Sequence, residues 1–314
     1  MRFKRAFTAM ALACCVAPAA LAQYYPTRPI RVIIPQGAGG GADLVARLLS
    51  IEIQRHLGQP FVIENRPGGN EAIGPEAVSK AAPDGYTIGI ISSTHSVNQT
   101  SAGIKLPFDP QKDFVPVAPM VRLPMVVMVP TSLGVNDLPT LIAQSKANPG
   151  KFNYGSAGPN TFAGIATEWL VRQSGADFTG VTYGGRGILQ GLVAGDVQLV
   201  FGGFAAASPT LQTGKAKIIA VTSPQRMRKL PAVPTVAESY PGYAVVPWYG
   251  FVAPAGTPAA VVARLNKAIG ESVTAITPKL LDMGNEAMVM TPAEFQSFLA
   301  ADLASWKKIV EAVQ

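Results

Sequence analysis

The sequence predicts an α/β protein made of two lobes joined by a hinge, and three observations support this. Short apolar strands alternate with helical patterns, which is typical of parallel β-α-β units with right-handed crossovers. A glycine-rich loop, residues 37–41, follows the first strand and opens the first helix. Two proline-rich extended stretches, near residues 115–125 and 240–252, have the pattern of chain crossings between lobes. Ligands of hinged proteins favour the cleft between the lobes.

The first 22 residues are predicted to be a secretory signal peptide. A basic head, residues 2–5, precedes an apolar run, residues 6–20, and Ala20-Leu21-Ala22 forms a small-x-small cleavage site. The apolar run is too short to span a bilayer. We therefore expect cleavage after Ala22 and export of the remaining chain, without a prebound cofactor.

Composition excludes several kinds of site. Cys14 and Cys15 both lie in the predicted signal peptide, so the mature chain has no disulfide, thiolate nucleophile or cysteine metal site. His56 and His95 are the two histidines of the chain, too few for a histidine-rich zinc site. Removing the signal takes away three basic and no acidic residues, which lowers the net charge from +7 to +4. This mild basic tilt favours small anions, and no Lys/Arg stripe indicates nucleic acid.

The pattern of apolar residues places the secondary structure. Strands or extended segments are expected at residues 31–34, 61–64, 86–91, 113–118, 125–129, 152–156, 178–183, 197–201, 217–222 and 246–252. Helices are expected from residue 44, where Leu44, Val45, Leu48 and Ile51 are the apolar positions, and at 73–82, 138–149, 162–174, 188–194, 259–273 and from 292 to the end. The last helix opens with a capping box, Thr291 to Glu294. Residues 92–96 are expected to form a polar loop.

Two loops without bulky side chains each precede a helix, in different halves of the chain. The glycine loop at 37–41 and the small-residue loop at 156–161 would each present free backbone N–H groups and the partial positive charge of a helix N-terminus, which is an anion site. Asp43 lies in the first turn of the first helix and would repel an anion. We therefore expect its carboxylate to point away or to be neutralised by Arg47.

A dinucleotide site is the main alternative. Residues 37–42 fit the pattern G-x-G-x-x-A, and Glu64 ends the next strand at a suitable distance. This would define an exported oxidoreductase, but export unfolded through a Sec-type signal and the second small-residue loop argue against it. A hydrolase site is also not favoured, because Gly155-Ser156-Ala157-Gly158 is not a nucleophile elbow, although His95 could serve Ser156. We therefore expect no catalytic residue and no cofactor.

Several ordered blocks make the chain similar to the receptors of tripartite tricarboxylate transporters, also called Bug receptors. The similarity runs from about Tyr25 to the C-terminus. The blocks that carry it are residues 29–43, Glu64-Asn-Arg-Pro-Gly68, Ala82-Pro-Asp-Gly-Tyr86, Pro149 to Gly158, Leu230 to Glu238 and Trp248 to Pro258. The resemblance implies a type II periplasmic-binding-protein fold, with lobe I formed by residues 23–124 plus 246–314 and lobe II by residues 125–245. It also implies a monomeric, non-enzymatic periplasmic protein that passes a small organic acid to membrane permease subunits.

The same resemblance implies a binding site for a ligand carboxylate between the two loops, held largely by backbone N–H groups. Mapped onto this chain, the expected ligand-binding residues are Gly37, Ala38, Gly39, Gly40, Ala42, Thr94, His95, Ser156, Ala157, Thr161, Tyr183, Gly184 and Gly202. No metal or cofactor is implied. A receptor that serves a sensor protein instead of a permease would have the same site, so the sequence leaves the partner open.

Three positions differ from the usual pattern of the family. Gly184 stands where a lysine is common, and Gly202 stands where an aspartate is common. A histidine that is often found in the helix after the small-residue loop is missing near Gly164. These differences predict a roomier, less charged distal pocket that suits a bulkier, aromatic or dicarboxylic acid and disfavours amino acids. Arg186 would either reach a second carboxylate or lie at the surface, and both interpretations remain open.

Overall fold

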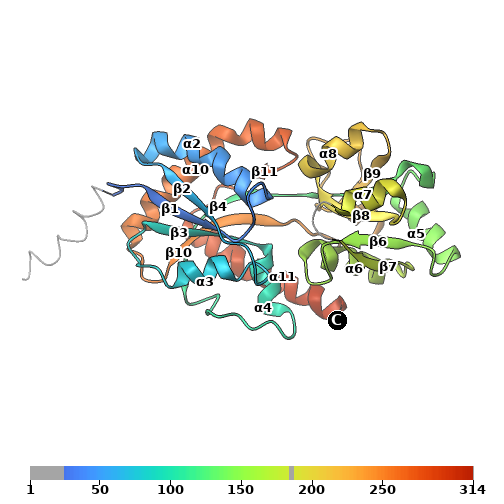
Figure 1. Ribbon diagram of the computed structural model, residues 1–314, viewed down its shortest axis with the longest axis horizontal. Coiled ribbons are helices and arrows are strands. Elements are labelled where there is room, and N and C mark those ends of the chain that lie inside the picture. Colours follow the sequence, from blue (N-terminus) through green and yellow to red (C-terminus); the bar gives the residue numbers. More distant parts are fainter. Residues whose placement is uncertain (1–24, 184–186, 314) are drawn as a thin grey trace, which may run out of the picture.

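The computed structural model describes residues 25–183 and 187–313, and these form two α/β lobes (Figure 1). Each lobe has one sheet with helices packed on it, and the chain crosses between the lobes. The predicted signal peptide, Gly184 and Arg186 lie outside the described residues. In the described part, no helix combines the length and hydrophobicity needed to cross a bilayer.

The first sheet has six strands in the order β11-β4-β10-β3-β1-β2. β1 pairs in parallel with β2 and β3, whereas β10 runs antiparallel to β3 and β4. Its strands are β1 (Ile30–Ile34), β2 (Phe61–Asn65), β3 (Thr87–Ser92), β4 (Phe114–Arg122), β10 (Trp248–Pro254) and β11 (Glu286–Ala287). The sheet therefore draws on two separate parts of the sequence.

The second sheet has five strands in the order β7-β6-β8-β5-β9. β6 pairs in parallel with β7 and β8, and β5 is antiparallel to β8 and β9. Its strands are β5 (Met125–Pro130), β6 (Asn153–Ser156), β7 (Thr179–Thr182), β8 (Leu199–Gly203) and β9 (Ala216–Val221). All five come from one continuous segment, residues 125–221.

Helices cover both sheets. In the first lobe α2 packs on α10, and α11 packs on α4. The helices of the first lobe are α2 (Gly41–Leu57), α3 (Ile73–Ser79), α4 (Ser93–Thr100), α10 (Ala259–Asp282) and α11 (Pro292–Val313). Those of the second are α5 (Leu138–Ala147), α6 (Phe162–Ser174), α7 (Gly187–Ala194), α8 (Phe204–Gln212) and α9 (Val236–Ser239), with a short 3-10 turn, η1 (Thr131–Leu133).

The two segments that cross between the lobes are hydrogen-bonded to each other. Leu123 N–H, between β4 and β5, donates to Pro247 C=O at 2.7 Å, just before β10. Thr222 connects β9 to both crossings, because its Oγ1 accepts from Met125 N–H at 3.0 Å and its C=O accepts from Val245 N–H at 3.0 Å. A hinge between the lobes would therefore bend at this narrow, hydrogen-bonded pair of segments.

The last helix contacts both lobes. The predicted capping box is confirmed, since Thr291 N–H donates to Glu294 Oε2 at 2.8 Å and Glu294 N–H donates to Thr291 Oγ1 at 3.2 Å. Phe295, in the first turn, packs with Trp248 of the first lobe. Trp306, Ile309 and Val310 are buried in the core of the second lobe. The expected lobe boundaries, which place residues 246–314 with the first lobe, do not anticipate this packing.

The predicted apolar face of α2 is partly wrong. Leu44 and Ile51 are 48% and 60% exposed, whereas the buried row contains Val45, Leu49 and Ile53. Both rows have helical spacing, and the sheet and α10 select the second one.

Three other expectations are corrected. Residues 93–96 belong to helix α4 and not to a loop, because the Ser92 side chain caps it by accepting from Thr94 N–H at 3.0 Å. Helix α8 was not expected, and it contains Pro209. Helix α10 continues nine residues beyond Val273, through Pro278.

Candidate functional site

Strand register places the glycine loop next to the crossings. Ser92, the last residue of β3, pairs with Tyr249, which is the second residue of β10 after its crossing. β1 is parallel to β3, so the carboxyl end of β1 at Ile34 lies on the same edge of the sheet. The loop that follows β1 therefore faces the second lobe, and Figure 1 shows the start of α2 on that side.

The same reasoning places the small-residue loop on the facing edge. Met125 begins β5 directly after the other crossing and pairs with Gly203 at the carboxyl end of β8. β6 is parallel to β8, so Ser156 and the loop after it lie on the edge that faces the first lobe. Strand ends from both sheets thus meet at the joint between the lobes, the usual position of ligand sites in open α/β sheets.

The glycine loop keeps some of its N–H groups free. Gly40 N–H donates to Gly37 C=O at 3.0 Å, and Ala42 N–H donates to the Gln36 side chain at 3.1 Å. The N–H groups of Gly37, Ala38 and Gly41 have no acceptor within the described residues. These unpaired donors at a helix N-terminus are what an anion requires.

Asp43 holds the loop from behind. Its Oδ2 accepts from Gly39 N–H and from Arg47 Nε, both at 2.9 Å, and its Oδ1 accepts from Asn65 Nδ2 at 3.0 Å. The hydrogen bond from Arg47 lowers the pKa of Asp43 to about 2, helped by the Gly39 and Asn65 hydrogen bonds and opposed by burial. The expected neutralisation by Arg47 is confirmed, and Gly39 N–H is consumed inside the protein.

A second polar network behind the loop was missed. Ala42 N–H can only donate a hydrogen bond, so the oxygen of the Gln36 amide, Oε1, must face it. The amide nitrogen of Gln36, Nε2, then points to Glu71 and donates to its carboxylate at 2.8 Å. Ser92 Oγ donates to the other oxygen of Glu71 at 2.6 Å. Burial raises the pKa of Glu71, although the hydrogen bonds from Ser92 and Gln36 oppose this. Tyr249 Oη lies 3.3 Å from Gln36 Nε2 and completes the network.

Glu71 has a left-handed backbone with φ of 65°, and Asn70 before it has φ of 52°. Such conformations are costly for residues other than glycine and concentrate at functional sites. The sequence signals a turn here through Gly68 and Gly69, but nothing local shows that the next carboxyl group turns inward toward β3.

The small-residue loop also keeps donors free. Gly158 N–H donates to Ser156 Oγ at 3.2 Å, and Thr161 Oγ1 both donates to Gly158 C=O at 2.8 Å and accepts from Gly164 N–H at 3.1 Å. The N–H groups of Ala157 and Asn160 have no acceptor within the described residues. Thr161 therefore shapes the loop, while Ser156 and Ala157 keep donors for a ligand.

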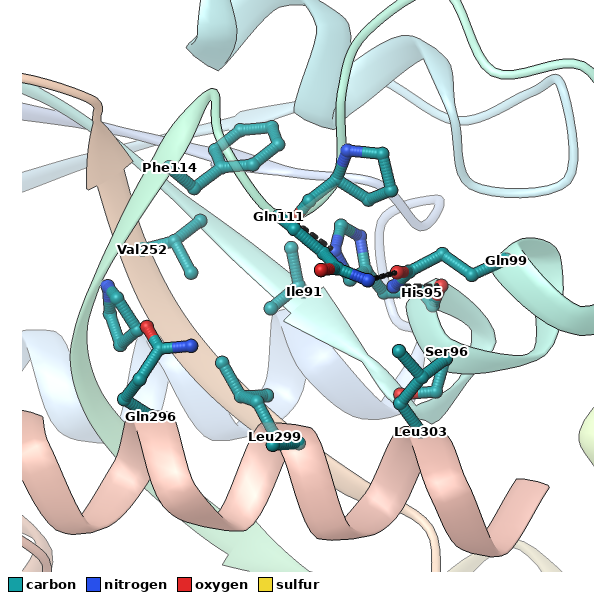
Figure 2. Close-up of a pocket in the computed structure, with 13 residues that line it drawn as sticks. Ile91, His95, Ser96, Gln99, Gln111, Phe114, Val252, Gln296, Leu299 and Leu303 are labelled. Carbon is teal, nitrogen blue, oxygen red and sulfur yellow. Dashed lines mark hydrogen bonds between the residues drawn. The ribbon is translucent and has the colours of Figure 1, made fainter. Parts of the chain in front are cut away.

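His95 does not join these loops. Its Nε2 lies 3.2 Å from Pro110 C=O, and its ring stacks on Phe108 and meets the edge of Phe114. It lines a pocket between α4 and α11 (Figure 2), none of whose lining residues belongs to either loop. Thr94, its neighbour, is buried in the first turn of α4.

The remaining expected residues are spread along the second lobe. A methyl group added at Gly191 would lie 2.6 Å from Tyr183 Oη, so the Tyr183 ring packs against α7. Gly202 pairs with Val126 inside the sheet, and a side chain there would meet Met128 at 3.2 Å. Gly184 and Arg186 lie outside the described residues.

The dinucleotide alternative finds little support in the geometry. Glu64, which would bind a ribose, is instead hydrogen-bonded to Arg31 and Arg66. The hydrogen bond from Arg31 is the main cause that lowers the pKa of Glu64. Among the described residues, no group of three histidine, cysteine or acidic side chains is placed to hold a metal ion.

Two α/β lobes joined by a pair of crossings form the fold of periplasmic binding proteins, and the structure of the periplasmic binding protein BugD matches with a TM-score of 0.80 at 28% identity, over 92% of this chain and 98% of that one. The fold alone also matches that of PhnD1 from Prochlorococcus marinus in complex with methylphosphonate, with a TM-score of 0.53 at 12% identity, over 88% of this chain and 98% of that one. Residues 45–314 match the model of the tripartite tricarboxylate transporter family receptor, and the chain belongs to this family. The family resemblance of the sequence is thereby confirmed.

Individual relatives agree. BugT of Bordetella pertussis is 33% identical over 301 residues, which covers 92% of this chain and 90% of BugT. The structure of Rhodopseudomonas palustris Rpa4515 with adipate has a TM-score of 0.84 at 31% identity, over 92% of this chain and 98% of that one. MatC from the same organism, with bound malate, has a TM-score of 0.78 at 31% identity, over 91% of this chain and all of MatC.

Proposed function

We propose that this receptor holds one carboxylate of a small organic acid between the glycine loop and the small-residue loop. The proposal is supported by the N–H groups of Gly37, Ala38 and Gly41 in one lobe and of Ala157 and Asn160 in the other, which have no acceptor within the described residues. Strand register puts both loops at the ends of their sheets next to the crossings. An anion that contacts both lobes binds the closed form more tightly than the open form, so it favours closure.

The ligand we propose is a dicarboxylic or aromatic acid. The related structures contain adipate and malate, both dicarboxylates. Gly202 offers no side chain that could pair with a cationic group of a ligand. Backbone N–H groups recognise the carboxylate, so the other end of the ligand would be selected by the shape of the pocket.

Family membership supports a periplasmic receptor without catalytic activity. We further propose, from the signal-peptide pattern of the sequence, that the mature protein begins after Ala22, and that it acts as a monomer. Its closed form docks on the permease subunits of a tripartite transporter. Docking of the closed form alone would require the ligand to shift the equilibrium between open and closed lobes.

Thermal unfolding with a panel of acids tests the site. A ligand at a hundred times its Kd adds about 2.7 kcal/mol to the free energy of unfolding. We expect stabilisation by adipate, malate or an aromatic acid, weaker effects from acidic amino acids, and none from NAD. Stabilisation by NAD alone would overturn the proposal and revive the dinucleotide alternative.

Substitution of a loop donor tests the residues. Ser156→Ala removes the hydroxyl group that Gly158 N–H contacts and should weaken binding of the stabilising acid roughly ten- to a hundredfold, as expected for one hydrogen bond to a charged group. Ser297→Ala, an exposed serine of α11, is the matched control and should leave the affinity unchanged. Equal affinity of both variants, measured by calorimetry, would contradict the proposed role of the second loop.

A further inference from the structure

The pocket around His95 is a cavity that the proposed carboxylate site does not use. It has a volume of about 160 Å³ and lies between α4, the segment 110–116, β10 and α11. Figure 2 shows Phe114 and Val252 on one side, with Leu299 and Leu303 of α11 on the other. A cavity of this size accommodates one benzene-sized ring.

His95 supplies a defined polar group inside this cavity. It is 9% exposed, and its Nε2 contacts Pro110 C=O, which can only accept a hydrogen bond. The proton therefore sits on Nε2, and Nδ1 is left as a bare acceptor with no partner among the described residues. Burial lowers the pKa of His95 to about 4, so the ring is neutral at physiological pH.

The rest of the lining is uncharged. None of the thirteen described residues around the cavity is acidic or carries a lysine or arginine side chain. The side-chain amide of Gln296 has no hydrogen-bond partner within the described residues. Gln111 Nε2 donates a long hydrogen bond, 3.4 Å, to Gln99 Oε1. Both glutamines are exposed, which places them at the mouth. An ion would lose its hydration there without a counter-charge, so the cavity selects neutral molecules.

We propose that this cavity is a second binding site, for a small neutral aromatic alcohol of the size of phenol. Its hydroxyl group donates to His95 Nδ1, and its ring packs against Phe114, Leu299 and Leu303. The site lies apart from the two loops, so it does not depend on the proposed function.

Nuclear magnetic resonance of the whole protein with 15N-labelled histidine tests this. The chain has two histidines, and His56, which lies 3.0 Å from Glu271, is the internal reference. Phenol should shift the Nδ1 resonance of His95 in a saturable 1:1 titration and leave His56 unchanged. Toluene, which has a methyl group in place of the hydroxyl, should bind about three- to tenfold more weakly. Benzoate should not displace phenol.

Two variants of α11 form a matched pair. Leu303→Phe fills the cavity and should abolish phenol binding, whereas Ala304→Phe, on the neighbouring position outside the cavity, should retain it. His95→Phe should remove the preference for phenol over toluene. The proposal is overturned if phenol leaves His95 unmoved, if Leu303→Phe binds phenol like the parent protein, or if benzoate or the acid of the main site displaces phenol.

Discussion

At the scale of single residues, Glu71 places a carboxyl group beside the loop that we propose binds an anion. Its oxygens accept hydrogen bonds from Gln36 and Ser92, and no lysine, arginine or histidine pairs with it within the described residues. An ionised Glu71 would repel a bound carboxylate, because like charges in a partly buried site are screened less than in water. Ligand affinity should therefore depend on the protonation of this residue.

Glu71→Gln should strengthen binding of the acid found in the thermal panel about tenfold at pH 8, and by a smaller factor as the pH falls. The glutamine can accept from Gln36 and donate to Ser92 Oγ, so the network survives. Burial raises the pKa of Glu71, so its charge, and the repulsion it causes, disappear as the pH falls.

Calorimetry between pH 5 and pH 8 measures this effect. Glu76→Gln, which breaks the pair with Lys80 on α3, is the control and should give the affinity of the parent protein. An affinity ratio for Glu71→Gln that stays close to one at every pH would contradict the proposed repulsion by Glu71.

At the scale of elements, the loop before α6 is shaped by one close backbone contact. A Cβ atom at Gly164 would lie 2.3 Å from Gly158 C=O, and this carbonyl also accepts from Thr161 Oγ1. The tight loop therefore requires glycine in the first turn of the helix. This close contact explains why Gly164 carries no side chain, although a histidine is common near this position in the family.

Gly164→Ala should lower the free energy of unfolding by about 1 to 3 kcal/mol, as overpacking against a backbone atom does. Gly270→Ala in α10 is the matched control. Its new methyl group would meet the exposed Val289 side chain at 3.3 Å, so the gain in helix propensity should make it neutral or stabilising. Urea unfolding of both variants compares them, and equal losses would refute the special role of Gly164.

Features that depend on a few neighbouring residues could be predicted from the sequence. Features that depend on packing between distant segments could not. The capping box at Thr291 and the loop before α2 are encoded within a few residues. The buried row of α2 depends on packing against α10, and Pro209 concealed α8 because proline disfavours a helix interior. His95 was expected to line the ligand site, but the start of α4 directs it toward Pro110. Position in a loop therefore did not determine where the side chain points.

At the scale of the whole molecule, α11 connects the lobes and carries an acidic residue where they meet. Ser96 Oγ of α4 donates to Asp302 Oδ2 at 2.6 Å, four residues before Trp306 enters the core of the second lobe. Burial raises the pKa of Asp302 to about 6, and the hydrogen bond from Ser96 offsets part of this. The folded protein thus binds this proton more tightly than the unfolded chain does.

The stability that the proton provides is complete below about pH 4 and is lost as the pH rises through about 6. Asp302→Asn keeps an acceptor for Ser96 and carries no charge, so it should match the parent protein near pH 4. At pH 8 it should be more stable by about 2 to 3 kcal/mol, the equivalent of a shift of about two pKa units.

Unfolding by urea at pH 4, 6 and 8 measures this difference. Asp282→Asn, whose side chain is 81% exposed and paired with Lys229, is the control and should change stability by less than about 0.5 kcal/mol at every pH. Because α11 packs on both lobes, the stabilisation by Asp302→Asn should appear in a single unfolding transition. If each lobe unfolded in its own transition and Asp302→Asn stabilised the first lobe alone, α11 would not couple the two lobes.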